Sequence, residues 1–188
     1  MGAEKEKMLR GELYQADDGD LAADMRRCQE LLVRLDSLPA GEERFGVLRE
    51  LLGGIGERSE LRSPFRCDYG YNIEVGSGVF ANYNCVFLDT GRITIGDGTE
   101  MGPAVQIYAA DHPHDPGLRR EYYEFSRPVT VGKNVWIGGG AILCPGVTVG
   151  DDSIIGAGSV VTRDVPAGVV AVGNPCRVVK SVHDGAGR

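Results

Sequence analysis

The chain has 188 residues, of which 42% are hydrophobic, and a formal net charge of −7 at pH 7; this length suits one principal domain. The acidic balance argues against a general nucleic-acid-binding protein, because such proteins usually present a basic face. No apolar stretch approaches the roughly 20 residues that cross a bilayer, and no signal-peptide hydrophobic region follows the first residues, so we expect a cytoplasmic protein without a membrane partner.

Residues 1–57 are predicted to form an N-terminal helical cap, because they are rich in Leu, Arg and Glu rather than in β-branched residues. Leu31 and Leu35 repeat at helical spacing, and Pro39 ends this first helix. A second helix over about 42–52 carries its apolar residues on one face. We expect the two helices to pack together against the rest of the chain.

A six-residue period begins in the next segment. A period of six fits neither a helix nor a single strand, so it describes a larger repeating unit. Two sets of positions follow it, separated by a two-residue slip near Thr90 and Gly91. The first set is Val75, Ala81 and Phe87, and the second is Ile95, Met101 and Ile107.

The period breaks from residue 109 to residue 127, and this break holds His112 and His114. Two prolines and a glycine argue against a regular element over its first part, while its length exceeds that of an ordinary turn. Its aromatic residues weigh against disorder. We therefore expect one long extruded loop with a functional role.

After the break the period is strict. The residue three places after each aliphatic belongs to the short list that tolerates a left-handed backbone, and the next is small or β-branched. Each hexad therefore predicts a short strand and a tight turn. The aliphatics are Val131, Ile137, Leu143, Val149, Ile155 and Val161, and the turn residues are Asn134, Gly140, Gly146, Asp152, Gly158 and Asp164.

Three such strands make a coil of about 18 residues, and stacked coils give an all-β, parallel β-helix with the aliphatics inside. We expect it to span 58–168. A β-sandwich is the alternative, but it would need strands at wider and less uniform spacing. Residues 169–188 should finish the last coil, cross it as a short strand and end in a polar tail. The sole tryptophan, Trp136, precedes an inward Ile137 and should face outward.

Several of these motifs, in fixed order, resemble the maltose and galactoside O-acetyltransferases and the related nodulation acetyltransferases, members of the hexapeptide-repeat, left-handed β-helix acyltransferases. The strings PAVQIYAADHPHDP and VGKNVWIGGGAILCPGVTVGDDSIIGAGSVVTRDVPAGVVAVGNPCRVV carry the resemblance, which covers about residues 8–180. It implies left-handed coils, which oppose the usual right-handed crossover. It also implies transfer of acetyl from acetyl-CoA to a sugar hydroxyl without a metal, by a homotrimer whose active sites lie between subunits.

By the same resemblance, His112 falls on the family's catalytic histidine. It would be the general base that takes the proton from the acceptor hydroxyl. The backbone N–H of Gly139 would stabilise the developing oxyanion, although a glycine also suits a tight turn. A loop histidine beside prolines can equally be exposed without a role, and for His114 both readings stay open.

The resemblance also supplies candidate binding residues. Ordinary solvated charge is the alternative for the basic ones, and a turn cap is the alternative for Asp89. Where the galactoside enzymes have an acidic acceptor contact this chain has Ala16, so Asp17 or Asp18 would have to replace it. The acetyl-CoA candidates are Trp136, Gly139, Ala157, Thr162, Arg163, Arg177 and Lys180, and the acceptor candidates are Asp17, Asp68, Asn82 and Asp89.

Other functions remain open from the residues alone. The same scaffold could acetylate serine or a xenobiotic, or it could be a noncatalytic trimeric scaffold. A β-helical carbonic anhydrase binds zinc through three histidines, but His112, His114 and His183 lack that family's spacing. The five cysteines are odd in number and include no CxxC pair, so reduced thiols are expected rather than disulfides or a metal site.

Overall fold

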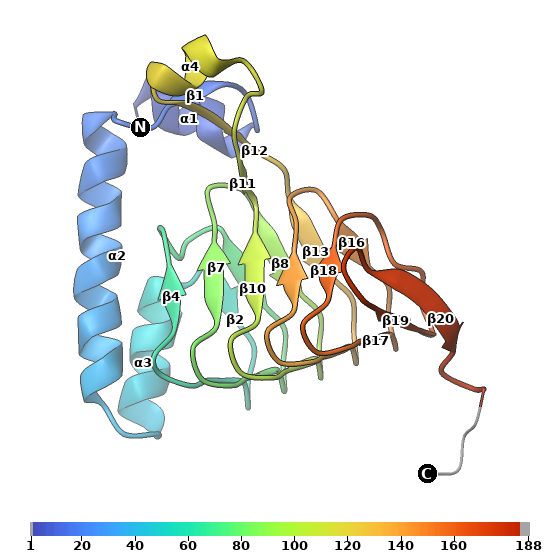
Figure 1. Ribbon diagram of the computed structural model, residues 1–188. Coiled ribbons are helices and arrows are strands. Elements are labelled where there is room, and N and C mark those ends of the chain that lie inside the picture. Colours follow the sequence, from blue (N-terminus) through green and yellow to red (C-terminus); the bar gives the residue numbers. More distant parts are fainter. Residues whose placement is uncertain (1, 185–188) are drawn as a thin grey trace.

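The hexads fold into three parallel sheets that enclose a triangular prism (Figure 1). The chain visits sheets 1, 2 and 3 in turn in each coil. Sheet 1 contains β2 (Gly54–Ile55), β5 (Ile73–Val75), β8 (Ile93–Ile95), β13 (Val129–Val131) and β16 (Thr148–Val149). Sheet 2 contains β3 (Glu60–Leu61), β6 (Phe80–Ala81), β9 (Glu100–Met101), β14 (Trp136–Ile137), β17 (Ile154–Ile155), β19 (Val169–Val172) and β20 (Arg177–Ser181). Sheet 3 contains β4 (Arg66–Cys67), β7 (Val86–Leu88), β10 (Gln106–Tyr108), β15 (Ile142–Leu143) and β18 (Val160–Val161).

The coils wind in the left-handed sense. In this computed structural model, which describes residues 2–184, the strands of sheet 3 face the viewer of Figure 1 and point upward. The coils advance from left to right, and the chain returns behind and below the near sheet. The predicted fold class is therefore confirmed, including a handedness that opposes the common right-handed crossover. Residue 1 and residues 185–188, the ends of the predicted cap and tail, lie outside the described residues.

The repeating aliphatics fill the prism. All six from Val131 to Val161 are at most 1% exposed, and each lies level with its counterpart one coil away, as Ile137 pairs with Met101 and with Ile155. Five of the six predicted turn residues have positive φ. Asp164 is the exception: its carboxylate accepts a hydrogen bond from the Thr148 amide at 2.8 Å and so caps the neighbouring coil instead.

The cap covers the first coil with α2 (Gly19–Ser37) and α3 (Glu42–Leu51), close to their predicted bounds. Their apolar faces share one core with the prism. At this boundary the sulfur atoms of Cys28 and Cys67, both free thiols, lie 3.6 Å apart. A shorter helix, α1 (Ala3–Leu9), and the strand β1 (Tyr14–Gln15) precede α2. None of the helices in the described residues is both long and apolar enough to cross a membrane.

The break at 109–127 is more regular than the sequence predicts. It contains β11 (Ala110–Asp111), a short helix α4 (Pro116–Arg120) and β12 (Tyr123–Ser126), and we call this segment the arm. The strands form a three-stranded antiparallel sheet in the order β1-β12-β11, which joins the arm to the cap. Proline suits the first turn of a helix, and the Asp115 carboxylate accepts hydrogen bonds from the Gly117 and Leu118 amides. At its base, the Arg127 amide donates to the Ala109 carbonyl at 2.9 Å.

The C-terminal strands close the other end of the prism. β19 continues sheet 2 beside β17 in parallel, and β20 turns back along β19 in the antiparallel direction. The strand predicted to cross the last coil is therefore β20. At the opposite end, β2 already belongs to sheet 1, so the first strand of the prism lies inside the range 1–57 predicted for the cap.

Candidate active site

Sheet 3 has two long edges that differ in composition. The arm edge is made by the connections that leave sheet 3 towards sheet 1, and it is the upper edge in Figure 1. The turn edge is made by the connections that enter sheet 3 from sheet 2. The arm edge comprises residues 68–72, 89–92, 109–128, 144–147 and 162–164, and the turn edge comprises residues 62–65, 82–85, 102–105, 138–141 and 156–159.

His112 directly follows β11 at the arm edge, and its side chain is exposed. Its amide donates to Asp111 Oδ1 at 2.9 Å, while Asp111 Oδ2 accepts from Arg127 Nε at 3.1 Å and from Nη2 at 2.5 Å. Asp111 thus ties the backbone at His112 to the far strand of the arm. The His112 ring makes no hydrogen bond or ion pair within residues 2–184, so it is available to a substrate. His114 is also exposed, and only its carbonyl is bound, by Arg119.

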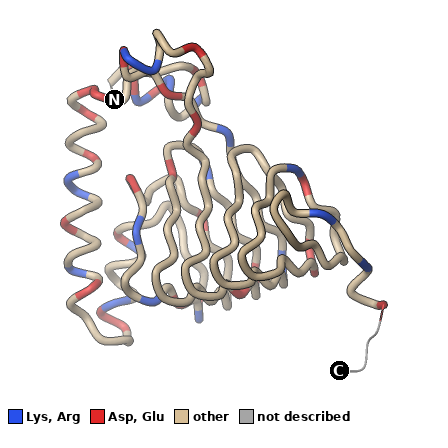
Figure 2. Tube along the Cα trace, viewed as in Figure 1, with Lys and Arg blue, Asp and Glu red and all other residues tan. Residues whose placement is uncertain are grey.

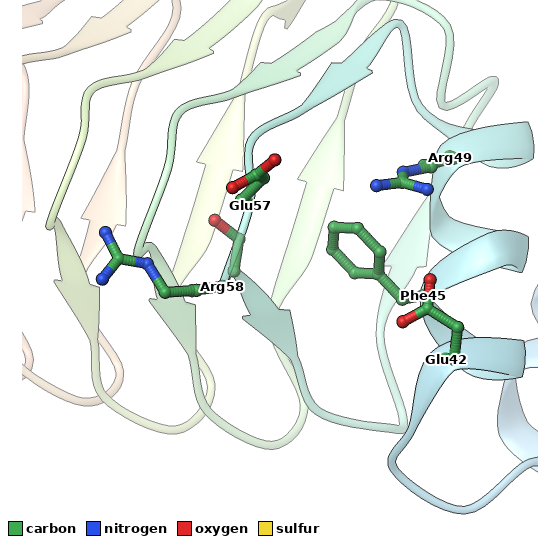
Figure 3. A pocket seen from close by; sticks show the side chains of 6 residues that line it. Glu42, Phe45, Arg49, Glu57 and Arg58 are labelled. Carbon is green, nitrogen blue, oxygen red and sulfur yellow. The ribbon is translucent and has the colours of Figure 1, made fainter.

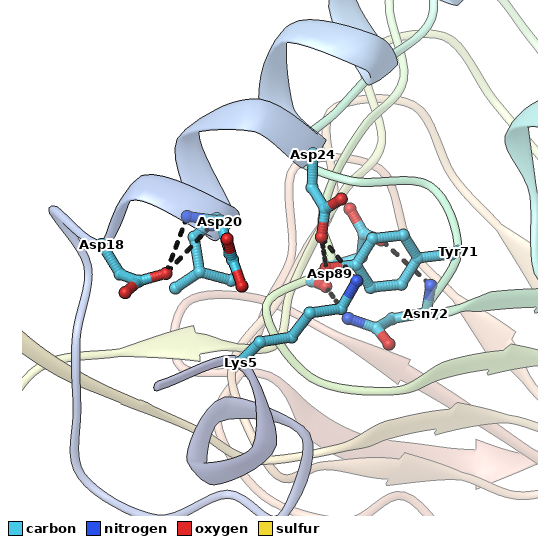
Figure 4. A network of polar contacts seen from close by, with 8 residues as sticks. Lys5, Asp18, Asp20, Asp24, Tyr71, Asn72 and Asp89 are labelled. Atoms are coloured by element: carbon cyan, nitrogen blue, oxygen red, sulfur yellow. Dashed lines mark hydrogen bonds and ion pairs between the residues drawn. The ribbon is translucent and has the colours of Figure 1, made fainter. Parts of the chain in front are cut away.

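Asp89 is fully buried at the arm edge and holds the previous coil in place. Its Oδ1 accepts hydrogen bonds from the amides of Asp68 at 3.0 Å and Tyr69 at 2.9 Å. Its Oδ2 accepts from the Asn72 amide at 3.3 Å, and the Asn72 side chain donates to the Asp89 carbonyl, as Figure 4 shows. Burial raises the pKa of Asp89, and these backbone donors oppose that shift. The structure therefore places Asp89 as a cap for residues 68–72.

Asp68 carries a more exposed carboxyl beside Asp89. Burial, followed by the charges of Asp89 and Glu124, raises its pKa to about 7. Its side chain makes no hydrogen bond within the described part of the chain, although its backbone amide is bound to Asp89. An unpaired, half-buried carboxyl near neutral pKa is typical of functional sites.

The cap closes over the arm edge through a second small core made of Met8, Tyr14, Leu21 and Tyr69. Next to it, Asp24 of α2 accepts from Lys5 Nζ at 2.5 Å and from Tyr71 Oη at 3.1 Å (Figure 4). The Tyr14 hydroxyl donates to Glu124 Oε2 at 2.9 Å and so links β1 to the arm. The arm, the cap and the first coils thus meet around Asp68.

Asp17 and Asp18 are the two candidates to replace the acidic acceptor contact that Ala16 does not supply. Within the described chain, only the side chain of Asp18 makes hydrogen bonds. Asp18 Oδ1 accepts from the amides of Asp20 and Leu21 and caps α2. Asp17 is exposed and makes no hydrogen bond or ion pair within residues 2–184. Ala16 itself is partly buried against the second core.

The turn edge carries the other predicted residues. Asn82 is partly buried, and its Oδ1 accepts from the Tyr83 amide at 2.8 Å. Gly139 lies where two coils approach closely, since a Cβ on Gly102 would sit 2.5 Å from the Gly139 nitrogen. That Gly139 amide donates no hydrogen bond within the described residues. Ala157 is exposed one coil further along.

The structure therefore separates the two halves of the predicted site within one chain. Gln106 pairs with Ile142, so Gly139 is level with Pro103 at the start of the β10 segment. The extended run from Val105 to Tyr108 spans ~10 Å, and His112 lies four residues beyond it. His112, Asp68 and Asp89 share the arm edge, whereas Asn82, Gly139 and Ala157 share the turn edge.

The remaining acetyl-CoA candidates surround the last coils. Thr162 and Arg163 are exposed at the arm edge just after β18. Trp136 faces outward from sheet 2 and is 56% exposed, as predicted. It lines a groove with Ile154 and His183. Arg177 and Lys180 are exposed on β20.

A hollow at the capped end of the prism lies apart from these residues. Figure 3 shows that its lining comes from α3 and the first coil and mixes both charges. Arg49 lies over the Phe45 ring, 4.6 Å from its centre. The hollow contains none of the predicted site residues, and its lining includes no histidine.

Sequence reasoning missed Tyr14 and Glu124. The available signal was the segment Tyr123–Ser126, which has the aromatic content of a strand directly before the period resumes. Within residues 2–184 no three His, Cys, Asp or Glu side chains converge as metal ligands would.

Comparison with known proteins gives consistent matches over nearly the whole chain. The family model described as bacterial transferase hexapeptide (six repeats) matches residues 128–163, and the maltose acetyltransferase hexapeptide capping motif matches residues 7–56. Nodulation protein L from Rhizobium leguminosarum bv. viciae is 56% identical over 178 residues, covering 94% of this chain and 94% of that protein.

Two solved structures extend these matches to the fold. The crystal structure of a maltose O-acetyltransferase from Clostridium difficile 630 is similar with a TM-score of 0.93 and 49% identity, covering 96% of this chain and 97% of that one. A hexapeptide-repeat containing acetyltransferase from Vibrio cholerae O1 biovar eltor, complexed with acetyl coenzyme A, has a TM-score of 0.90 and 36% identity, covering 97% and 100%.

Proposed function

Because the chain belongs to the hexapeptide-repeat acetyltransferases that carry the maltose acetyltransferase cap, we propose that it transfers acetyl from acetyl-CoA to a hydroxyl group of a sugar or sugar-like acceptor. The Vibrio cholerae relative in complex with acetyl coenzyme A supports the donor, and the maltose O-acetyltransferase supports the acceptor class. The observation that carries the proposal is the unpartnered imidazole of His112, held by its backbone at the rim of the carboxyl-lined arm edge.

In the proposed reaction His112 takes the proton from the acceptor hydroxyl as that oxygen attacks the thioester carbonyl. The new C–O bond forms while the carbonyl oxygen gains negative charge, which the free amide of Gly139 would stabilise. The C–S bond then breaks, and the departing thiolate of coenzyme A takes the proton back from His112. No covalent acyl-enzyme is required.

This reaction needs the arm edge and the turn edge within contact distance, and we propose that a homotrimer brings them together. The outward side chains of sheet 3 from β7 to β18 are uncharged and partly buried, and Figure 2 shows few charges on this near face. Sheet 1 is more polar, with Glu74 and several threonines outward. Packing sheet 3 against a neighbour would bury its apolar side chains and set His112 of one subunit against Gly139 of the next. The outward residues of sheet 3 from β7 to β18 are Val86, Leu88, Gln106, Tyr108, Ile142 and Val160.

Thiol release from acetyl-CoA, measured against maltose, a galactoside, serine and chloramphenicol, tests the proposal. We expect turnover with a sugar, and a loss of at least ~100-fold in turnover in His112→Ala, the usual worth of general-base catalysis. His114→Ala is the matched control and should keep its activity. Unchanged activity in His112→Ala would contradict the mechanism, and no turnover with any acceptor would favour a noncatalytic scaffold.

A further inference from the structure

Tyr14 and Glu124, in two strands, and His112, directly after a third strand, line up across the sheet formed by the cap and the arm. Tyr14 of β1 is directly opposite Glu124 of β12. On the other side of β12, Asp111 is opposite Phe125, so continuing the antiparallel register sets His112 opposite Glu124. Residues directly opposite each other in antiparallel strands project on the same face, with Cβ atoms ~5 Å apart. Glu124 therefore lies between the buried Tyr14 and the proposed general base.

One oxygen of Glu124 is fixed and the other is free. Oε2 accepts the Tyr14 hydroxyl proton at 2.9 Å. Tyr14 is fully buried, and burial together with the Glu124 charge raises its pKa, so the hydroxyl stays protonated and keeps donating. Oε1 accepts no hydrogen bond from any residue in the described part of the chain. The Tyr14 hydroxyl thus orients the Glu124 carboxylate and leaves Oε1 free to accept a hydrogen bond from another molecule.

Asp68 faces the same space from the first coil. The Glu124 charge is one of the causes that raise the Asp68 pKa to about 7, after burial and Asp89, so the two carboxyls are close enough to interact. The Thr90 side chain, only 5% exposed, lies beside the Tyr14 hydroxyl and lowers its pKa, against the effects of burial and of Glu124.

These contacts point to a role for Glu124 in addition to that of His112. We propose that Glu124, oriented by Tyr14, is a specificity-determining residue that together with Asp68 accepts hydrogen bonds from hydroxyl groups of the acceptor and so presents a neighbouring hydroxyl to His112. This inference rests on the proposed sugar acetylation. A hydroxyl-rich acceptor fits because a hydroxyl donates strongly to a carboxylate, and because adjacent sugar hydroxyls match two carboxyls side by side.

The variant Glu124→Gln tests the role, with Glu121→Gln as the matched control. Glu121 is exposed at the end of α4, three residues away in the same arm. We expect Glu124→Gln to raise the acceptor KM ~10-fold, as for loss of a hydrogen bond to a charged group, while the acetyl-CoA KM stays within ~2-fold and kcat within ~3-fold. Tyr14→Phe should raise the acceptor KM less, and Glu121→Gln should match the unsubstituted protein.

Deoxy sugars sharpen the assignment. An acceptor that lacks the hydroxyl bound by Glu124 should react poorly with the unsubstituted enzyme. Glu124→Gln should lower the reactivity of that deoxy acceptor only slightly further, because the missing hydroxyl and the substitution remove the same interaction. Equal KM values for Glu124→Gln and Glu121→Gln would overturn the proposal. So would a fall in kcat alone, shared by all acceptors.

A binding measurement separates this inference from the proposed function. Ligand-observed NMR with maltose and methyl galactoside needs no turnover. If the unsubstituted protein binds a sugar but transfers no acetyl group, the proposed function fails, and weaker binding by Glu124→Gln than by Glu121→Gln still supports the role of Glu124. If neither sugar binds the unsubstituted protein, the inference is wrong.

Discussion

The two edges of sheet 3 are built from the same hexads but are used differently. At the turn edge the connections are short and regular, with a left-handed residue such as Asn84, Ala104, Gly140 or Gly158 at successive levels. At the arm edge every connection differs: one is capped by a buried aspartate, one contains the slip at Thr90 and one expands into the arm. Repetition supplies a rigid frame, and departures from it hold the side chains that can do chemistry.

The difference also shows what each edge can contribute. The turn edge presents mainly backbone, such as the free amide of Gly139, and close coil packing fixes its position. The arm edge presents titratable side chains held by contacts from the cap, as Glu124 is by Tyr14. A group-transfer site needs both a fixed backbone donor and a tunable acid–base group, so neither edge is complete alone.

Ile137→Ala tests whether the aliphatic core of the prism stabilises the fold that carries both the arm edge and the turn edge. Ile137 is fully buried next to the turn edge, and truncating a buried isoleucine to alanine typically costs ~2–5 kcal/mol of unfolding free energy. Denaturant unfolding should show this loss, whereas Val179→Ala, at a position 56% exposed on β20, should change stability by less than ~1 kcal/mol. Equal losses would mean that the hexad aliphatics are not what holds the prism.

Mixed subunits test whether the two edges act together across an interface. His112→Ala damages the arm edge, and Ala157→Trp adds bulk at an exposed position of the turn edge, so each variant alone should be nearly inactive. Co-expressed in equal amounts, they should recover about a quarter of the unsubstituted activity, because a trimer that mixes subunits at random restores that share of interface sites. No recovery would show that both edges of one site come from the same chain.

Asp68→Asn tests whether the arm edge holds a carboxyl group with a raised pKa. The folded protein raises the Asp68 pKa to about 7 from an ordinary 3.8. Between these values the unfolded chain has lost the proton that the folded chain keeps, so this group lowers stability as pH rises from about 4 to 7. Asp68→Asn removes the penalty and should be more stable than the unsubstituted protein by up to about 4 kcal/mol at pH 8, and similar to it at pH 4.

Thermal unfolding at the two pH values measures this, with the exposed Asp17→Asn as the matched control. A stability difference that does not depend on pH would contradict a raised pKa at Asp68.

The smallest expected effect is in the cap. Asp18 caps α2 through two backbone amides, and replacing such a residue with alanine typically costs ~1 kcal/mol. Asp18→Ala should therefore lower the midpoint of chemical unfolding slightly, while Glu30→Ala on the exposed face of α2 should not. If Asp18→Ala also raised the acceptor KM, the cap would contribute to the arm edge directly.

The sequence predicts the prism well because its information is local. A buried position every six residues and a turn residue three later recur whatever the rest of the chain does, and Ile137 could be assigned inward without any partner being known. The end of the first cap helix could be placed for the same reason, since Pro39 acts within a few residues of itself.

The arrangement of the site is different, because it depends on contacts between distant residues. Tyr14 and Glu124 are 110 positions apart, and nothing near either one indicates the other. The break was recognised, but the pairing of β12 with both β1 and β11 was not. The positions of His112 and Gly139 on opposite edges also follow only from the winding of the coils in space.

The hydrogen bond that closes the base of the arm, from the Arg127 amide to the Ala109 carbonyl, makes the arm a replaceable part. The arm does not interrupt the strand pairing of the prism, since β13 pairs with β8 and β15 pairs with β10 as if residues 110–126 were absent. Lengthening a closed surface loop costs little, about 0.6 kcal/mol for each doubling. Evolution or an engineer could therefore exchange the segment that carries His112, the proposed general base, without redesigning the prism that supports it, and such an exchange would change the acceptor.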